Sequence, residues 1–338
     1  MNRRVLLASV AVLSALIGAL PAAAQQFTAR IGHLESDQQP RHKGLVMVAD
    51  LVKERTDGNV AFQLFPAGQL GQAREMNEGT QLGLMEGTVS PAAFLAGFNP
   101  AVSILDVPFL YPADRAQANE LRTGAFGQAV LDSFAPLGLK AIAIWPNGRK
   151  SMTSNEEIAA LEDFAGQSFR VMDSKVLIEQ FNAVGASAVA LPFGELYTAL
   201  QTGVVDGQEN ALDTIATMKY HEVQDYLLVS EHGANEDVVM FNQAWWDGLP
   251  AEYQTVIIEA FEEVRPQVEE LKEAAQATAL ETIRASDITI QELDDAQRAA
   301  FREAMYGPAR DAYLANAGAA GQGIVDAYEA QYSAVSGQ

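Results

Sequence analysis

Alternation of apolar and polar residues over 27–34 predicts a first β-strand. The next segment carries apolar residues at helical spacing and stops at the turn signal Asp57-Gly58, which predicts an amphipathic helix. A second alternating strand over 60–64 and a helical stretch from Arg74 follow. This strand, helix, strand, helix order is typical of an α/β unit built on a largely parallel sheet.

The middle of the chain continues this alternation, and helices dominate its end. Residues 139–145 are nearly all apolar, as expected for a strand buried on both faces. A helix is predicted over 175–184, and further strands are predicted over 168–172, 186–191 and 236–242. From Pro250 onward the pattern is almost wholly helical, with a kink expected at Pro266 and a bend at the GAAGQG segment, 318–323. Because no linker separates two halves, two lobes that share several chain crossings are expected.

The first residues follow the three-part pattern of a secretory signal. Arg3 and Arg4 precede an apolar run over 5–20, and small residues follow Pro21. This pattern predicts a signal peptide over 1–24 that is removed after Ala24, which would place a bacterial protein in the periplasm. An uncleaved anchor is the alternative, although a spanning helix needs about 20 apolar residues and this run is shorter.

Composition narrows the classes of function. The 338 residues include 22 Lys and Arg against 44 Asp and Glu, a formal net charge of −22 that disfavours nucleic acid and anionic lipid as partners. Cysteine is absent, which excludes thiol nucleophiles, disulfides and cysteine-ligated metal centres. The length and the balanced hydropathy suit a globular chain of roughly two domains.

Catalytic signatures are missing from the sequence. It has no GxSxG elbow, no phosphate-binding GxxxxGK[ST] loop and no HExxH helix. His33 and His42, with Glu35 between them, are a weak alternative as a metal site, because their spacing matches no standard site. His33 and Glu35 do end the first strand, where α/β sheets place their binding crevices.

The concentrated chemical signal lies between residues 147 and 210. Its three blocks are NGRKSMTSN (147–155), GQSFRVM (166–172) and LPFGELYTALQTGVVDGQEN (191–210). In the last block Gly203 is expected to cap a short helix, and a turn at Asp206-Gly207 is expected to present polar side chains to a pocket. Arg170 sits inside a short apolar strand, where a cation needs a partner. That partner is a ligand carboxylate, which matches the guanidinium fork, or one of the many acidic residues in a structural ion pair.

These blocks resemble the solute-binding proteins of tripartite ATP-independent periplasmic (TRAP) transporters. FPAGQLGQAREM (65–76) and NQAWWDGLPAEYQ (242–254) resemble them too, and all five occur in the family's order across nearly the whole mature chain. The resemblance implies an α/β fold of two lobes, of the periplasmic binding protein type II kind, with a ligand cleft crossed by hinge strands and a long helix. We expect lobe I to comprise 25–147 and 236–280, and lobe II to comprise 148–235 and 281–338.

The resemblance also implies where the ligand is held. An arginine at the position of Arg170 usually grips the ligand's carboxylate in this family, and an asparagine at the position of Asn210 usually contacts it. A second arginine is frequent at the position where this chain has Lys150, and Arg149 stands one residue earlier, so which of the two faces the cleft is open. Further candidates for the cleft are Met172 in lobe II, His33, Glu35, Gln72, Ser90 and Phe94 in lobe I, and Glu236 after the return crossing.

The resemblance implies a binding protein without catalysis, cofactor or metal. It would capture a small organic anion, most simply a carboxylate, and deliver it to the membrane permease subunits of a TRAP transporter. A binding protein of an ATP-driven importer shares the two-lobed layout and is the first rival. A secreted hydrolase that uses paired carboxylates is the second, supported only by the abundance of acidic residues.

Overall fold

The computed structural model describes residues 27–337, and the predicted signal peptide lies outside them. One mixed sheet of nine strands runs through the molecule in the order β2-β1-β3-β8-β4-β7-β5-β6, with β9 paired to β8. The strands are β1 (Phe27–Gly32), β2 (Val60–Phe65), β3 (Gly87–Pro91), β4 (Leu139–Ser154), β5 (Ser168–Val171), β6 (Ser187–Ala190), β7 (Gly207–Ala211), β8 (Tyr226–Asn242) and β9 (Thr289–Glu292).

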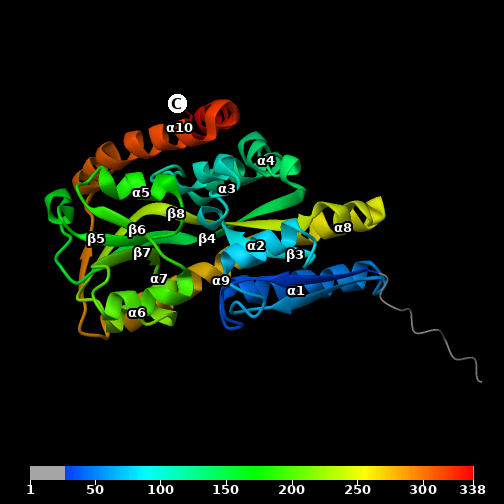
Figure 1. Ribbon diagram of the computed structural model, residues 1–338, viewed down its shortest axis with the longest axis horizontal. Helices are drawn as coiled ribbons and strands as arrows, with labels where there is room; N and C mark the ends of the chain where they lie inside the picture. The colour runs from blue at the N-terminus through cyan, green and yellow to red at the C-terminus, as the bar shows by residue number, and fades with distance from the viewer. Residues whose placement is uncertain (1–26, 338) are drawn as a thin grey trace, which may run out of the picture.

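Helices lie on both sides of this sheet, as Figure 1 shows. The α-helices are α1 (Pro40–Arg55), α2 (Ala73–Gln81), α3 (Arg115–Thr123), α4 (Ala125–Asp132), α5 (Lys175–Asn182), α6 (Leu196–Gln201), α7 (Leu212–Thr217), α8 (Gln243–Asp247), α9 (Ala251–Arg284) and α10 (Asp295–Ser336). Short 3₁₀ turns lie at η1 (Ala92–Phe94), η2 (Pro100–Asp106), η3 (Ala135–Leu137), η4 (Leu161–Phe164), η5 (Phe193–Glu195) and η6 (Tyr220–Glu222). Strands β1, β2 and β3 are neighbours at one end of the sheet and fall in the predicted lobe I, whereas β5, β6 and β7 are neighbours at the other end and fall in the predicted lobe II.

Two long strands join the lobes. β4 and β8 pair antiparallel, and each also pairs antiparallel with a strand of one lobe, β4 with β7 and β8 with β3. The expected parallel pairing holds between β1 and its neighbours and between β5 and its neighbours, and β9 also pairs parallel with β8. The prediction of a largely parallel sheet was therefore wrong at its centre, because strands that return between lobes must run against their neighbours.

Local sequence signals set several element ends. Gly203 has a φ of 68° directly after α6, which confirms it as the residue that ends this helix. The Asp294 side chain accepts a hydrogen bond from the backbone N–H of Gln297 and begins α10. Gly318 leaves helical geometry inside α10, with φ 60° and ψ −141°, so the expected bend in GAAGQG is confirmed. α9 continues as one helix past Pro266.

The last two helices tie the lobes together. α9 packs against α1 of the first lobe and α7 of the second, and it runs diagonally between them in Figure 1. The first part of α10, through Phe301 and Met305, packs on the apolar core of the second lobe. Its last part, through Tyr313 and Tyr328, packs with residues of η2, α3 and α4. Within residues 27–337, no helix combines the length and the apolar character needed to span a membrane.

Candidate functional site

A small cavity of about 30 Å³ lies where the two lobes meet, and we call it the cleft cavity. Segments that are far apart in the sequence contribute to it: the turn after β1, the start of α1, the ends of β3, β5 and β7, and the two crossing strands. Its lining residues are Leu34, Glu35, Arg41, Pro91, Phe94, Asn147, Met172, Phe193, Asn210, Thr214 and Asn235. The cleft cavity therefore brings together four residues that the sequence indicated: Glu35, Phe94, Met172 and Asn210.

Arg170 is buried next to this cavity, on β5. Its Nε and Nη2 donate to the carbonyl oxygen of Leu191 at 3.0 and 2.7 Å, and its guanidinium carbon lies 6.0 Å from the centre of the Phe94 ring. Among residues 27–337, no carboxylate lies within 4 Å of Arg170. Burial lowers its pKa to about 10, so the side chain remains a cation at neutral pH. A buried cation without an anionic partner is costly, and a ligand carboxylate would offset that cost.

Glu35, on the wall from the first lobe, is held as an anion by two cations. Its Oε1 lies 3.4 Å from the Lys272 Nζ of α9 and 3.6 Å from the Arg41 Nη2 of α1. Burial alone would raise the pKa of Glu35, but Arg41 and Lys272 lower it to about 2. Lys272 also pairs at 2.6 Å with Asp213 of α7, so this ion network links the turn after β1 to α9 and α7.

Arg41 is a cation that the sequence did not single out. Its Nε and Nη2 form a bidentate pair with Asp237 of β8 at 2.6 and 2.7 Å. Its Nη1 is buried without a hydrogen-bond partner among the described residues. Buried polar atoms are normally satisfied, so an unpartnered N–H on a cavity wall is expected to meet a ligand or water.

Two amide oxygens on the crossing strands are also buried and unpartnered within residues 27–337. They are the Oδ1 atoms of Asn147 on β4 and Asn235 on β8. The Nδ2 of Asn147 donates to Asp237 at 3.2 Å, which leaves its oxygen as the free end. A donor from Arg41 and acceptors from these asparagines therefore surround the same small space, which suits a ligand that both accepts and donates hydrogen bonds. Arg170 itself is not a lining residue and lies next to Phe94 of the cavity wall.

Asn210 reaches the cavity from β7. Its Nδ2 donates to the Gln208 Oε1 at 2.6 Å on the same face of the strand. The sequence predicted a turn at Asp206-Gly207 that presents the polar residues of DGQEN at its end. In the structure, 207–211 instead form a buried strand, β7, between β4 and β5. The polar side chains are therefore fixed by strand pairing, which holds them more rigidly than a turn would.

Lys150 does not line the cleft cavity. Its Nζ is buried and lies 2.7 Å from the Glu209 Oε1, and the other oxygen of Glu209 interacts with His232 at 2.8 Å and accepts from Gln180 at 2.6 Å. Burial alone would raise the pKa of Glu209, but Lys150 and His232 bring this pKa far below its ordinary value. This buried cluster lies behind β7 and fixes the strand that carries Asn210.

Arg149 and Glu236 also lie away from the cleft cavity. Arg149 donates to the backbone carbonyl oxygens of Tyr111 and Pro112 at 3.4 and 2.5 Å, on the other side of β4. Glu236 accepts two hydrogen bonds from Arg122, at 2.9 and 2.7 Å. Both side chains therefore form hydrogen bonds within the protein, and neither lines the cleft cavity.

The remaining candidates lie around the rim. His33 is buried with its Nε2 3.1 Å from the His42 Nδ1, and within residues 27–337 no group of three His, Cys, Asp or Glu is arranged to hold a metal. Ser90 is buried beside Pro91 of the cavity wall, with an unpartnered Oγ. Gln72 is exposed directly before α2, and a Cβ added at Gly194 would lie 3.3 Å from the Gln72 Nε2.

Sequence reasoning missed five of the lining residues that contact the cavity with polar or aromatic atoms: Arg41, Asn147, Phe193, Thr214 and Asn235. Asn147 and Phe193 stand inside two of the quoted blocks, so the signal for them was present. Arg41 and Asn235 carry no local signal, because only the crossing strands and the first helix bring them to the same point.

Fold and site together define a two-lobed solute-binding protein with a polar cleft between its lobes. The family model "Bacterial extracellular solute-binding protein, family 7" matches residues 31–314, so the chain belongs to that family. The C4-dicarboxylate-binding periplasmic protein DctP of Rhodobacter capsulatus is 32% identical over 307 residues, which cover 87% of this chain and 91% of that protein.

Solved structures are similar over nearly their whole length. A TRAP periplasmic solute-binding protein from Desulfovibrio salexigens, with bound orotic acid, is 61% identical with a TM-score of 0.90, over 91% of this chain and 99% of that one. Another, from Sulfurospirillum deleyianum with bound succinate, is 31% identical with a TM-score of 0.81, over 91% and 99%. These likenesses confirm the two-lobed fold and the TRAP solute-binding family that the sequence blocks indicated.

Proposed function

We propose that this protein captures a small organic acid in the periplasm through Arg170 and delivers it to the membrane subunits of a TRAP transporter. The observation that carries the proposal is the buried Arg170 cation, which has no carboxylate partner among the described residues and lies beside a cavity between two lobes. Its remaining donor capacity matches a carboxylate. The family supports a TRAP transporter rather than an ATP-driven importer, and a role in binding rather than catalysis.

We further propose that the ligand is a flat, nitrogen-containing ring acid of the orotate type. Phe94 and Phe193, one from each lobe, offer aromatic faces to such a ring. The free oxygens of Asn147 and Asn235 would accept from ring N–H groups, and the free Arg41 Nη1 would donate to a ring carbonyl. The 61% identical relative, solved with bound orotic acid, supports this class.

Capture requires the lobes to move. A cavity of about 30 Å³ holds little more than one water, so an organic acid reaches it only when the lobes separate. The proposed lobes are 25–147 with 236–280 and 148–235 with 281–338, and β4, β8 and α9 would carry the hinge. The ion network of Glu35, Lys272 and Asp213 joins elements of both lobes, which suits a contact made on closure.

The cellular location is proposed on two grounds. Relatives such as DctP are periplasmic binding proteins. The predicted signal peptide over 1–24, with removal after Ala24, would export this chain to the same compartment. No cofactor or metal is needed for capture by this site.

A thermal-shift panel tests the proposal. Orotate, succinate, galacturonate and ectoine are added separately to the mature protein, and a ligand at 100 times its dissociation constant stabilises the fold by about 2.7 kcal/mol. We expect orotate to raise the Tm most. A panel in which no organic acid changes the Tm would contradict the proposed capture, and a shift with succinate alone would contradict only the ring-acid part.

A further inference from the structure

A second, larger cavity of about 630 Å³ lies on the opposite face of the crossing strands, and we call it the hinge cavity. Along β4, Asn147 lines the cleft cavity, whereas its neighbours Pro146 and Gly148 line the hinge cavity. Along β8, Asn235 lines the first and Ala234 the second. Since successive side chains of a strand point to opposite faces, β4 and β8 form the wall between the two cavities.

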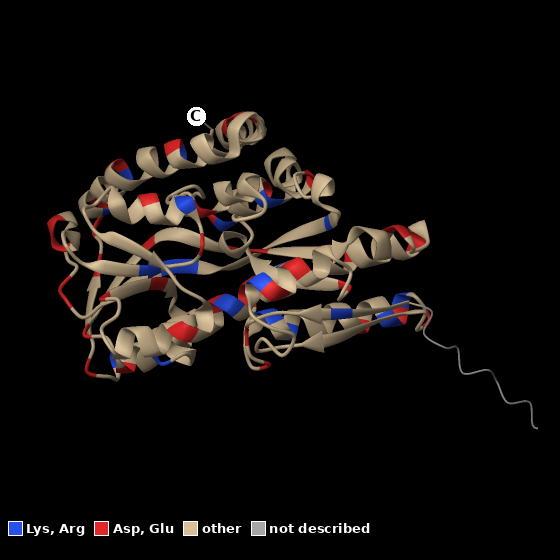
Figure 2. Ribbon diagram, in the orientation of Figure 1, with Lys and Arg blue, Asp and Glu red and all other residues tan. Residues whose placement is uncertain are grey.

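Positive charge gathers in this cavity although the chain as a whole is acidic. Six of the 22 Lys and Arg residues line it, against three of the 44 Asp and Glu. In Figure 2, positions of Asp and Glu recur along the helices and turns of the ribbon. A local excess of cations inside a concave surface attracts anions even when the net charge is negative, because distant surface charges are screened beyond about 8–10 Å.

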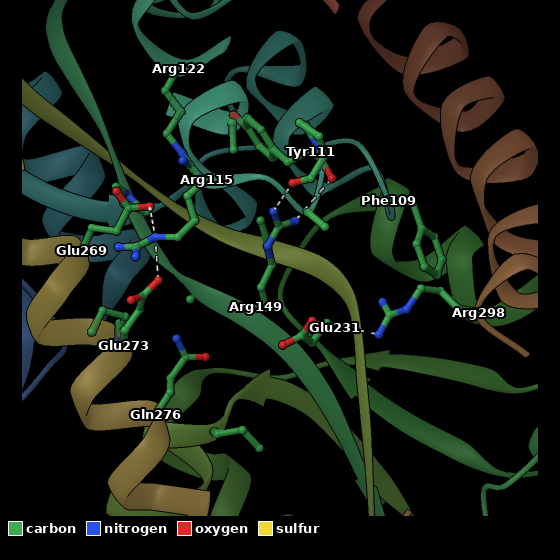
Figure 3. A pocket seen from close by; sticks show the side chains of 18 of the residues that line it. Phe109, Tyr111, Arg115, Arg122, Arg149, Glu231, Glu269, Glu273, Gln276 and Arg298 are labelled. Atoms are coloured by element: carbon green, nitrogen blue, oxygen red, sulfur yellow. Dashed lines mark hydrogen bonds and ion pairs between the residues drawn. The ribbon is translucent and has the colours of Figure 1, made fainter. Parts of the chain in front are cut away.

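Within residues 27–337, two of these cations, Arg149 and Arg302, have no carboxylate within 4 Å, and a third, Arg298, has only a long ion pair. Arg149 donates only to backbone carbonyls, and burial and the nearby Arg122 lower its pKa. Arg302 donates to the Phe109 carbonyl at 3.4 Å, and its guanidinium carbon lies 5.3 Å from the centre of the Tyr306 ring. Arg298 lies 3.9 Å from Glu231, and Figure 3 shows that pair across the cavity from Arg149. The other three cations are each paired at 2.7 Å or less, Arg115 with Glu273, Arg122 with Glu236 and Lys272 with Asp213.

The backbone is strained where the cavity wall turns. Phe109 and Glu231, both on the lining, have φ values of 57° and 45°, which non-glycine residues rarely adopt. Such strain clusters at functional sites. It aims an aromatic ring and a carboxylate at the same space that Arg149 faces. The backbone strain at Phe109 and Glu231 is a second observation, separate from the excess of cations on the cavity lining.

We propose that the hinge cavity binds an organic anion of metabolite size, with its anionic group held by Arg149, Arg298 and Arg302. The apolar body of the ligand packs on Phe109 and Tyr111, and the volume lies within the usual range for small-molecule sites. The ligand chemistry is therefore an acid group on an apolar or aromatic frame.

Occupancy of the hinge cavity favours the closed cleft, a consequence that rests on the proposed lobe closure. The present arrangement has a narrow cleft cavity and a wide hinge cavity on opposite faces of one wall. Rotation of the lobes that opens the cleft narrows the hinge cavity. Each ligand then increases the affinity for the other by the same factor, and couplings of this kind are typically about 5–150-fold.

Anilinonaphthalene sulfonate is the probe, since it combines an acid group with an aromatic frame and fluoresces when its frame leaves water. Arg298→Gln/Arg302→Gln is compared with Arg310→Gln/Arg284→Gln, which removes two paired arginines outside the cavity, one half-buried and one exposed. We expect saturable binding by wild type and the control pair, and at least tenfold weaker binding by the cavity pair. Equal binding by both pairs overturns the site.

Two further arms separate this site from the cleft. Arg170→Gln is expected to keep the affinity for the probe while it loses orotate, so failure of the cleft assignment leaves the hinge-cavity result intact. Saturating orotate is expected to increase the affinity of the wild-type protein for the probe by at least about fivefold. Competition between orotate and the probe, or loss of probe binding in Arg170→Gln, would place the probe in the cleft and overturn the proposal.

Discussion

The guanidinium carbon of Arg170, on the strand β5 of one lobe, lies 6.0 Å from the centre of the Phe94 ring, on the η1 turn that follows β3 of the other. Because the two residues belong to different proposed lobes, the proposed opening of the cleft would break this contact. It stabilises the closed arrangement by an interaction worth about 0.5–2 kcal/mol between a desolvated cation and an aromatic face. A ligand carboxylate at Arg170 would therefore sit where the two lobes already meet.

Phe193 is expected to contribute apolar contact to the ligand from the second lobe. Phe193→Ala removes that ring from the cavity wall and should weaken orotate binding by about 1–3 kcal/mol, measured by calorimetric titration. Phe193→Leu should retain part of the affinity. If Phe193→Ala binds orotate as wild type does, the ring does not contact the ligand.

Asn235 is expected to read a hydrogen-bond donor on the ligand. Its buried Oδ1 has no hydrogen-bond partner among the described residues, so Asn235→Ala should weaken the binding of orotate by about 0.5–1.5 kcal/mol. The affinity of the same variant for succinate, which has no ring N–H, should change little. An equal loss for both acids would indicate a general structural defect instead of a specific contact.

Lys272 is expected to stabilise the fold through its two carboxylate partners. Lys272→Met leaves Glu35 and Asp213 buried together without their cation, which should cost about 3–5 kcal/mol in the free energy of unfolding. Chemical denaturation measures this, with Lys43→Met on the exposed face of α1 as the matched control. Equal stability of the two variants would show that the ion network contributes nothing.

Asp106 should make stability fall as pH rises. Burial raises the pKa of this carboxyl from 3.8 to about 7 in the folded protein, so the folded state prefers the protonated form. The stability it contributes is present in full below pH 4 and is lost as pH rises through 7. Asp106→Asn does not ionise, so it should gain about 2 kcal/mol over wild type between pH 5 and pH 8 in denaturation experiments. A pH-independent difference would contradict this assignment.

Much of the fold could be predicted from local pattern. The strands β1 and β2, the helix α1 and the glycine that ends α6 follow from periodicity and turn chemistry, because each is decided by a few neighbouring residues. The polar halves of β4 and β8 could not be predicted. Their residues face two cavities and a buried charge cluster, so the alternation that marks an ordinary strand is absent.

The candidate site was predictable to a similar degree. Glu35, Phe94, Met172 and Asn210 stand at or near element ends or in recognisable blocks, and the structure brings them to one cavity. Lys150 illustrates the limit. Its sequence position resembles that of a ligand-binding cation, but its orientation depends on Glu209 of a strand about 60 residues away, a contact that local pattern does not reveal.

Arg170 carries the central claim, and calorimetric titration of orotate into wild type, Arg170→Lys and Arg170→Ala tests it most directly. Arg170→Ala should lose about 2–5 kcal/mol of binding free energy, because it removes the charge that meets the ligand's carboxylate in a closed cleft. The affinity of Arg170→Lys for orotate should lie between those of wild type and Arg170→Ala, since an ammonium keeps the positive charge but lacks the paired donors of a guanidinium. Undiminished affinity in Arg170→Ala would contradict the account.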